Sequence, residues 1–355
     1  MQAKTLKVGM IGAGGIGRVH METFAKTEGA EIVAVTDVNR EAAEKAAKEY
    51  GIARVHDSAE KLIEDPDLDA VIIGVPNKWH APLAVKALQA NKHVLLEKPM
   101  AIDLNDAKKI RDAALKSDRV LMISHQMRWE GPAMAVKEKV EQGELGNIYH
   151  AKTGWFRRKG IPGWGSWFTQ KQMSGGGPLI DIGVHMLDLA LYLMGNPKPV
   201  SVTGSTYAEF GPKKRGIGNW GTPNWDGVFD VEDIASAFIK MEDGSSLTLD
   251  VSWAVHMDTD SMPFIHLMGS EGGASIRGNK VKILKEIDNE AKDFELVVDT
   301  DDKAARVRLS QHFIDCIREG KKPISDVMSG YTNNLILEAI YESSRTGREV
   351  ILNWE

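Results

Sequence analysis

The chain has 355 residues, enough for about two domains of ordinary size. Hydrophobic residues make up 43% and charged residues 26%, as in soluble globular proteins, and a net charge of −6 argues against a dedicated nucleic-acid-binding protein. The single cysteine excludes an intrachain disulfide framework and a cysteine-based zinc site. No apolar run approaches the roughly 18 residues of a transmembrane helix, and no signal peptide is evident, so we expect a cytoplasmic protein without a membrane partner.

The first 125 residues alternate between apolar runs and helical stretches. Runs rich in Val and Ile lie at 7–11, 31–36, 70–75, 93–96 and 120–124, and helices are predicted at 16–27, 40–50, 81–91 and 104–116. Short apolar strands separated by amphipathic helices indicate βαβ units and a parallel sheet covered on both faces. We therefore predict a doubly wound Rossmann domain over residues 1–125.

After residue 125 the pattern changes. Helices are predicted at 132–141, 178–194, 303–319 and 327–345, with a strand at 147–156 and mainly strands over 200–298. This order predicts an α+β domain over residues 126–355, with a large, mostly antiparallel open sheet. The segment 207–231, rich in Gly and Pro and carrying Trp220 and Trp225, is predicted to be a long ordered loop.

A glycine motif, GAGGIG at 12–17, follows the first predicted strand and opens the first helix, as a dinucleotide-binding G-x-G-x-x-G must. Gly12 permits a tight turn, Gly14 lets a pyrophosphate approach the backbone, and Gly17 allows close helix packing. The alternative is a glycine-rich turn that binds nothing. The predicted cofactor-binding residues of this segment are Gly12, Gly14, Gly15, Ile16 and Gly17.

Asp37 ends the second predicted strand, 20 residues after Gly17. A carboxylate at this position can accept hydrogen bonds from the ribose hydroxyls of the cofactor, and it would repel a 2′-phosphate. The sequence therefore predicts NAD rather than NADP.

Two further motifs carry groups for acid–base chemistry. Lys98 follows the strand at 93–96, on the cofactor edge of the sheet, where it could donate a proton or stabilise an alkoxide; a solvated lysine is the alternative. In GGGPLIDIGVHMLD, at 175–188, a helix would place Asp181, His185 and Asp188 on one face. They could form a metal site, a structural polar patch or a general-base pair, and a single histidine disfavours the metal.

Together, GAGGIG, VPNKWHAPLAVKALQANKHVLLEKP and GGGPLIDIGVHMLDLALYLMG resemble the Gfo/Idh/MocA family over essentially the whole chain. These proteins are two-domain oxidoreductases of sugars and cyclitols. The resemblance implies that Lys98, Asp181 and His185 form the catalytic group, and that the peptide bond before Pro99 is cis. It also implies a cofactor-side group made of Pro76, Asn77, His80, Glu97 and Lys98.

The resemblance implies NAD-dependent oxidation of a secondary hydroxyl of a sugar, glycoside or cyclitol. His185 would be the base, Asp181 would orient it, and Lys98 would stabilise the developing alkoxide; the alternative makes Lys98 the base. Two other functions are weighed. Glycoside cleavage through transient oxidation is disfavoured because the Gly-His-rich signature of that branch is not found. A non-catalytic NAD-binding regulator would not need the intact catalytic group.

Several residues are candidates for substrate binding. Arg128 could line the substrate or form a domain-linking salt bridge. Trp155, Trp164 and Trp167 could stack on a sugar ring or pack in the core. The run Arg157, Arg158 and Lys159 could attract an anionic group, although a solvated run is favoured. By analogy with the family, a homodimer or homotetramer is expected through the open face of the second sheet.

Overall fold

The computed structural model describes residues 4–354 and divides into two compact units. The first comprises Met1–Gln126 and Asp302–Thr332, and the second Met127–Asp301 and Asn333–Glu355. The predicted division assigned 302–332 to the second domain, and here the structure differs. Helix α9 (Asp302–Glu319) packs on α1 (Gly15–Phe24) of the first unit, a return of the chain that hydrophobic periodicity does not reveal.

The first unit is built on a parallel sheet of six strands, in the order β3-β2-β1-β4-β5-β6. This order reverses between β1 and β4, which is the topological switch point where doubly wound proteins bind nucleotides. The prediction of a Rossmann domain is confirmed. The strands are β1 (Leu6–Ile11), β2 (Ala30–Thr36), β3 (Arg54–Val55), β4 (Ala70–Ile73), β5 (His93–Glu97) and β6 (Leu121–Ser124).

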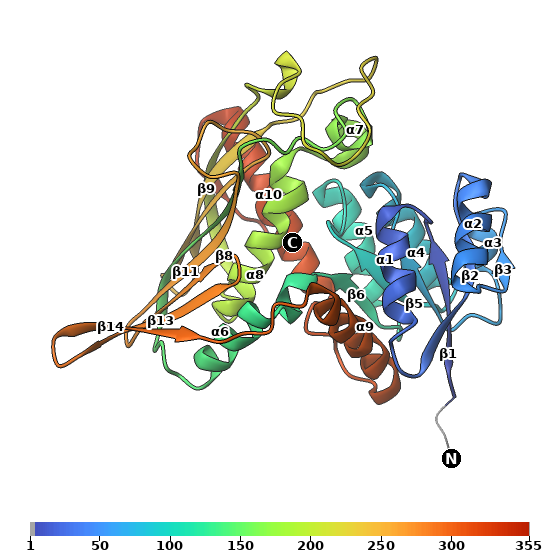
Figure 1. Ribbon diagram of the computed structural model, residues 1–355, viewed down its shortest axis with the longest axis horizontal. Helices are drawn as coiled ribbons and strands as arrows, with labels where there is room; N and C mark the ends of the chain where they lie inside the picture. The colour runs from blue at the N-terminus through green and yellow to red at the C-terminus, as the bar shows by residue number, and fades with distance from the viewer. Residues whose placement is uncertain (1–3, 355) are drawn as a thin grey trace. The chain divides into compact units, whose positions relative to one another are not determined.

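The helices of this unit start at local polar caps. The side chains of Asn39, Ser58 and Asp103 each accept a hydrogen bond from a backbone N–H in the first turn that follows. Every residue of β4 and β5 is buried, because helices cover both faces of the sheet (Figure 1). The helices after α1 are α2 (Arg40–Tyr50), α3 (Ala59–Ile63), α4 (His80–Gln89) and α5 (Leu104–Leu115).

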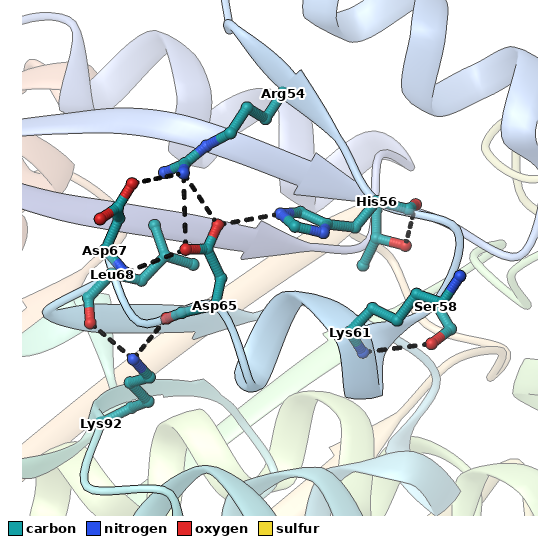
Figure 2. Close-up of polar contacts among 9 residues, drawn as sticks. Arg54, His56, Ser58, Lys61, Asp65, Asp67, Leu68 and Lys92 are labelled. Atoms are coloured by element: carbon teal, nitrogen blue, oxygen red, sulfur yellow. Dashed lines mark hydrogen bonds and ion pairs between the residues drawn. The ribbon is translucent and has the colours of Figure 1, made fainter.

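A polar cluster joins the segments that lead into β4 and β5 (Figure 2). Asp65 accepts hydrogen bonds from Arg54 and His56, while the buried Lys92 donates to the carbonyls of Asp65 and Leu68 at 2.6 and 2.8 Å. The cluster lies at the amino ends of β4 and β5. Because nucleotides bind at the carboxyl ends of such strands, we assign this cluster a structural role.

The second unit contains a sheet of nine strands, in the order β14-β13-β12-β11-β7-β10-β9-β8-β15. Within the described residues, β7–β10 is the one parallel strand pair of this sheet, which confirms the predicted, mostly antiparallel sheet. In β9 (Ile234–Met241) burial alternates along the strand, so one face of the sheet is covered and the other is open. The other strands are β7 (Ile148–Arg157), β8 (Pro199–Tyr207), β10 (Ser246–Ser252), β11 (Ser261–Gly269), β12 (Gly273–Arg277), β13 (Lys280–Ile287), β14 (Glu290–Leu296) and β15 (Val350–Ile351).

Helices α6 (Gly131–Glu141) and α8 (Val184–Leu193) pack on the covered face, and α10 (Val327–Thr346) runs from the first unit into the second. The segment Lys171–Leu193 is long and apolar enough to cross a membrane by composition, contrary to the expectation that no run approached this length. However, 89% of its most apolar window is buried inside the protein. That burial is typical of a core helix.

Candidate active site

The glycine loop between β1 and α1 has the geometry that a dinucleotide needs. Gly12 has φ +103°, and a Cβ there would collide with the carbonyl oxygen of Gly74. A Cβ on Gly17 would collide with the carbonyl oxygen of Gly12, so that glycine permits close packing. Beside Gly14 and Gly15 the space is open to 4 Å. Among the described residues no side chain caps α1, which leaves its N-terminus to a phosphate.

Asp37 holds this loop in place. Its Oδ2 accepts a hydrogen bond from the Ala13 amide at 2.7 Å, and its Oδ1 accepts one from the Asn39 amide at 2.8 Å. Each carboxylate oxygen retains a lone pair for a ribose hydroxyl. Asp37 therefore has a second role, fixing the glycine loop, that its position in the sequence did not reveal. The loop and Asp37 fit an NAD molecule.

His80 connects the loops that follow β4 and β5. The imidazole is fully buried, with Nδ1 2.7 Å from the Pro99 carbonyl oxygen and Nε2 2.9 Å from the Val75 carbonyl oxygen. Burial lowers the pKa of His80. Its observed contacts are with backbone, so it braces the cofactor-side loops; the predicted border with the nicotinamide stays a prediction. Nearby, Pro76 is half-buried and Asn77 is buried.

The Glu97-Lys98-Pro99 segment contains the expected cis peptide bond, between Lys98 and Pro99. Glu97 Oε1 lies 2.8 Å from His20 Nε2 of α1, and Oε2 accepts a hydrogen bond from the Lys98 amide at 3.2 Å. Burial by itself would raise the pKa of Glu97, but the hydrogen bond and charge of His20 outweigh it and lower the pKa to about 2. Glu97 is therefore an anion that anchors the backbone of Lys98.

Asp181 and His185 occur in the second unit, on the segment expected to be one α-helix over 178–194. The structure instead has a π-helical turn, η4 (Leu179–Gly183), that leads into α8. Such turns are rare and are frequent at functional sites. Asp181 Oδ2 accepts a hydrogen bond at 3.0 Å from the indole of the fully buried Trp253. Trp253 lies 72 residues from Asp181 along the chain, so this contact could not be predicted from the sequence.

Asp188 forms hydrogen bonds with residues other than Asp181 and His185. Its carboxylate accepts two hydrogen bonds from Arg128, at 2.8 and 2.6 Å, and one from Asn333 at 3.0 Å. The Arg128 guanidinium also lies over the Tyr192 ring, and the Arg128 and Asp188 side chains are 1% and 2% exposed. Arg128 therefore forms a salt bridge within the second unit, so this bridge does not link the domains. The substrate contact of Arg128 stays a prediction.

The tryptophans before the π-helical turn are placed differently from one another. Trp164 is buried, donates to the Gly211 carbonyl at 2.7 Å and stacks on Trp225, so it orders the 207–231 loop. Trp167 stacks on Phe168 and is half-buried. The half-buried Trp155 donates to Ser261 at 3.0 Å. Trp155 and Trp167 remain candidates for a sugar face, whereas Trp164 is a packing residue.

Arg157 departs from the solvated run that was favoured. Arg158 and Lys159 are exposed, but Arg157 is half-buried, with its guanidinium 4.5 Å from the Trp155 ring centre. Burial lowers the pKa of Arg157, against the attraction of Asp181. For metals, no group of three or more His, Cys, Asp or Glu side chains able to hold an ion occurs within residues 4–354.

Comparisons with known proteins agree with these features. Residues 6–125 match the "Oxidoreductase family, NAD-binding Rossmann fold", and residues 133–275 match the "GFO/IDH/MocA C-terminal domain". The chain is 32% identical to D-glucoside 3-dehydrogenase of Escherichia coli, over 99% of both chains. It is 26% identical to scyllo-inositol 2-dehydrogenase (NAD(+)) of Bacillus subtilis, over 98% of this chain and 96% of the other.

Among solved structures, a levoglucosan dehydrogenase in complex with NADH and levoglucosan superimposes with a TM-score of 0.88. That match is 23% identical and covers 99% of this chain and 100% of the other, so it supports the fold. The two family matches and the full-length relative at 32% identity lead to one conclusion. The chain belongs to the Gfo/Idh/MocA family of oxidoreductases, whose N-terminal domain is an NAD-binding Rossmann fold.

Proposed function

We propose that this protein is an NAD-dependent dehydrogenase that oxidises a secondary hydroxyl of a sugar, glycoside or cyclitol. The observation that carries the proposal is the glycine loop held by Asp37, in a chain whose family resemblance implies a catalytic group of Lys98, Asp181 and His185. The relative aligned over its whole length acts on glucosides. A pyranoside oxidised at C3 is therefore the first substrate to test, and a cyclitol the second.

Each catalytic residue has a role that its chemistry supports. Bound NAD supplies the hydride acceptor. His185 takes the proton of the substrate hydroxyl, and Asp181 orients the imidazole. Lys98 hydrogen-bonds the reacting oxygen and stabilises negative charge as the carbon loses hydride. Exchanging the roles of Lys98 and His185 is the alternative, because two coupled groups can share one proton.

The same proposal covers assembly and location. The open face of the nine-stranded sheet carries Tyr207, Phe238 and Phe264 among serine, threonine and lysine side chains. Phe238 and Tyr207 are exposed. We propose that this face is buried in a homodimer or homotetramer, since exposed aromatic side chains favour association. The chain composition supports a cytoplasmic location.

The test is an absorbance assay for NADH formation. Purified protein receives NAD or NADP with alkyl glucosides, free aldoses and inositols, and Lys98→Ala serves as the control. We expect NADH with one substrate class, lost in the control. Glycoside consumed without net NADH would replace the proposal by cleavage through transient oxidation. Tight NAD binding with no consumption of any compound would favour a regulator.

A further inference from the structure

The π-helical turn that carries Asp181 has no local cap. The first amides of a helix need acceptors, and these are usually side chains next to them in sequence. Here Gly177 and Pro178 offer none, and Leu179 and Ile180 are buried away from water. Buried N–H groups left without acceptors would destabilise the folded protein. Acceptors must therefore come from elsewhere in the fold.

Glu232 supplies them from a position 55 residues along the chain. Its two oxygens each lie 2.9 Å from the Gly177 amide nitrogen, and Oε1 also accepts from the Leu179 amide at 3.0 Å. The Tyr341 hydroxyl donates to the same Oε1 at 3.0 Å. All of these partners are donors, which suits a carboxylate, and negative charge is favourable at the N-terminus of a helix.

Burial affects the pKa of both members of this pair. Burial raises the pKa of Glu232, against the hydrogen bonds from Gly177, Leu179 and Tyr341. Burial and the charge of Glu232 raise the pKa of Tyr341 well above its usual value, so the phenol keeps its proton. Tyr341 therefore remains a donor to Glu232 over the whole working pH range.

The glycines before the turn make this contact possible. A Cβ on Gly176 would collide with the Tyr341 hydroxyl, and a Cβ on Gly177 with the carbonyl oxygen of Glu232. Gly175 has φ +89° and ends the short helix α7 (Lys171–Ser174). Two glycines of this run therefore leave room for the half-buried Tyr341 and the buried Glu232.

We propose that Glu232 and Tyr341 are positioning residues for the catalytic group. We assign neither side chain a contact with the reacting atoms. Glu232 fixes the amides at positions 177 and 179, so the π-helical turn begins at one defined place and sets where Asp181 lies, four residues before His185. The inference rests on the proposed function of Asp181 and His185.

The kinetic test uses Glu232→Gln and Tyr341→Phe. The glutamine keeps the size of the side chain but presents an N–H₂ group to an amide that needs an acceptor. We expect kcat to fall roughly 10- to 100-fold in E232Q, since small displacements of catalytic groups have effects of this size, and by less in Y341F. Affinity for NAD should not change. The matched control is E242Q, an exposed carboxylate of the same unit paired with Lys198.

A double-mutant cycle separates positioning from general destabilisation. If Glu232 acts through Asp181, the effect of E232Q on kcat should largely disappear in an Asp181→Asn background. An undiminished effect in that background, or unchanged kcat in both E232Q and Y341F, would overturn the inference. If E232Q does not fold, Y341F enters the same cycle in its place.

A second readout does not depend on activity. Trp253 donates to Asp181, so a 5-fluorotryptophan label there reports on that carboxylate. We expect the Trp253 fluorine resonance, assigned with Trp253→Phe, to move in E232Q and Y341F but not in E242Q. An unmoved resonance would contradict the inference even with no substrate known. A missing wild-type activity would instead overturn the proposed function.

Discussion

His20 Nε2 lies 2.8 Å from Glu97 Oε1, and the two side chains are 4% and 8% exposed. This contact joins helix α1, which follows the glycine loop, to the end of strand β5, directly before Lys98. The other oxygen of Glu97 accepts from the Lys98 amide. The glycine loop and Lys98 are therefore connected through the buried contact between His20 and Glu97.

Removing His20 should weaken both stability and catalysis. His20→Ala leaves the buried Glu97 carboxylate without its imidazole hydrogen-bond partner, so we expect a loss of about 3 kcal/mol in the free energy of unfolding. His20→Gln retains a donor and should lose less. Urea unfolding at pH 7 measures both values. Equal stability of H20A and wild type would show that the pair contributes nothing.

The pair also predicts acid sensitivity. The pKa of Glu97 is about 2 in the folded protein, below its usual 4.5, so the unfolded chain binds the extra proton. The stabilisation is fully present above pH 4.5 and is lost as pH falls toward 2. Unfolding curves across this range should be flatter for Glu97→Gln than for wild type. If stability depends on pH in the same way in both proteins, Glu97 is not the source of the acid sensitivity.

His93 predicts a second pH dependence at milder acidity. Burial, aided by the charge of Arg119, lowers its pKa from 6.5 to about 4, and Nδ1 accepts a hydrogen bond from the Val120 amide. Its contribution is complete above pH 6.5 and falls by roughly 3 kcal/mol as pH drops to 4. His93→Asn keeps an acceptor without titrating. The free energy of unfolding of this variant should change less between pH 6.5 and 4 than that of wild type. An equal change in both proteins would show that His93 is not the source of this pH dependence.

Asp37 should determine the choice of cofactor. Asp37→Ala removes the repulsion of a 2′-phosphate, so the ratio of kcat/KM for NAD to that for NADP should fall at least about tenfold. The control is Asp57→Ala, an exposed acid of the same unit. A wild-type preference for NADP, or an unchanged ratio in D37A, would show that the interpretation of this carboxylate is wrong.

Arg128 should behave as a structural residue. Arg128→Met removes the two guanidinium hydrogen bonds of the buried Asp188 carboxylate, so we expect a stability loss of about 3–5 kcal/mol. In material that remains folded, KM for the sugar should change little. A large rise in KM at nearly wild-type stability would restore the substrate contact predicted from the sequence.

Much of the fold could be predicted because its signals are local. The unbroken apolar runs of β4 and β5 and the glycine loop identify a Rossmann domain by composition and spacing alone. The cis peptide bond before Pro99 was predicted from the family resemblance and not from the local sequence. Helix α9 follows the second unit in sequence but belongs to the first unit. Hydrophobic periodicity predicts such a helix but not the unit against which it packs.

The supporting residues of the site could not be predicted, because their partners are distant in sequence. Glu232 lies 55 residues from Gly177, and His20 lies 77 residues from Glu97. A buried carboxylate in a sequence looks the same as a solvated one. Arg128 is a similar case. The sequence left a substrate contact and a salt bridge equally open, and only the fold brings Asp188 close to Arg128.

Hydride transfer from a ring carbon of a sugar to NAD is the step that defines the proposed function. It can be followed with a glucoside that carries deuterium at C3, by mass spectrometry of the nicotinamide. We expect one deuterium in the NADH formed for each sugar oxidised, and none with Lys98→Ala. NADH formed without the label would exclude oxidation at C3, and oxidation of this glucoside without reduction of NAD would exclude hydride transfer to NAD.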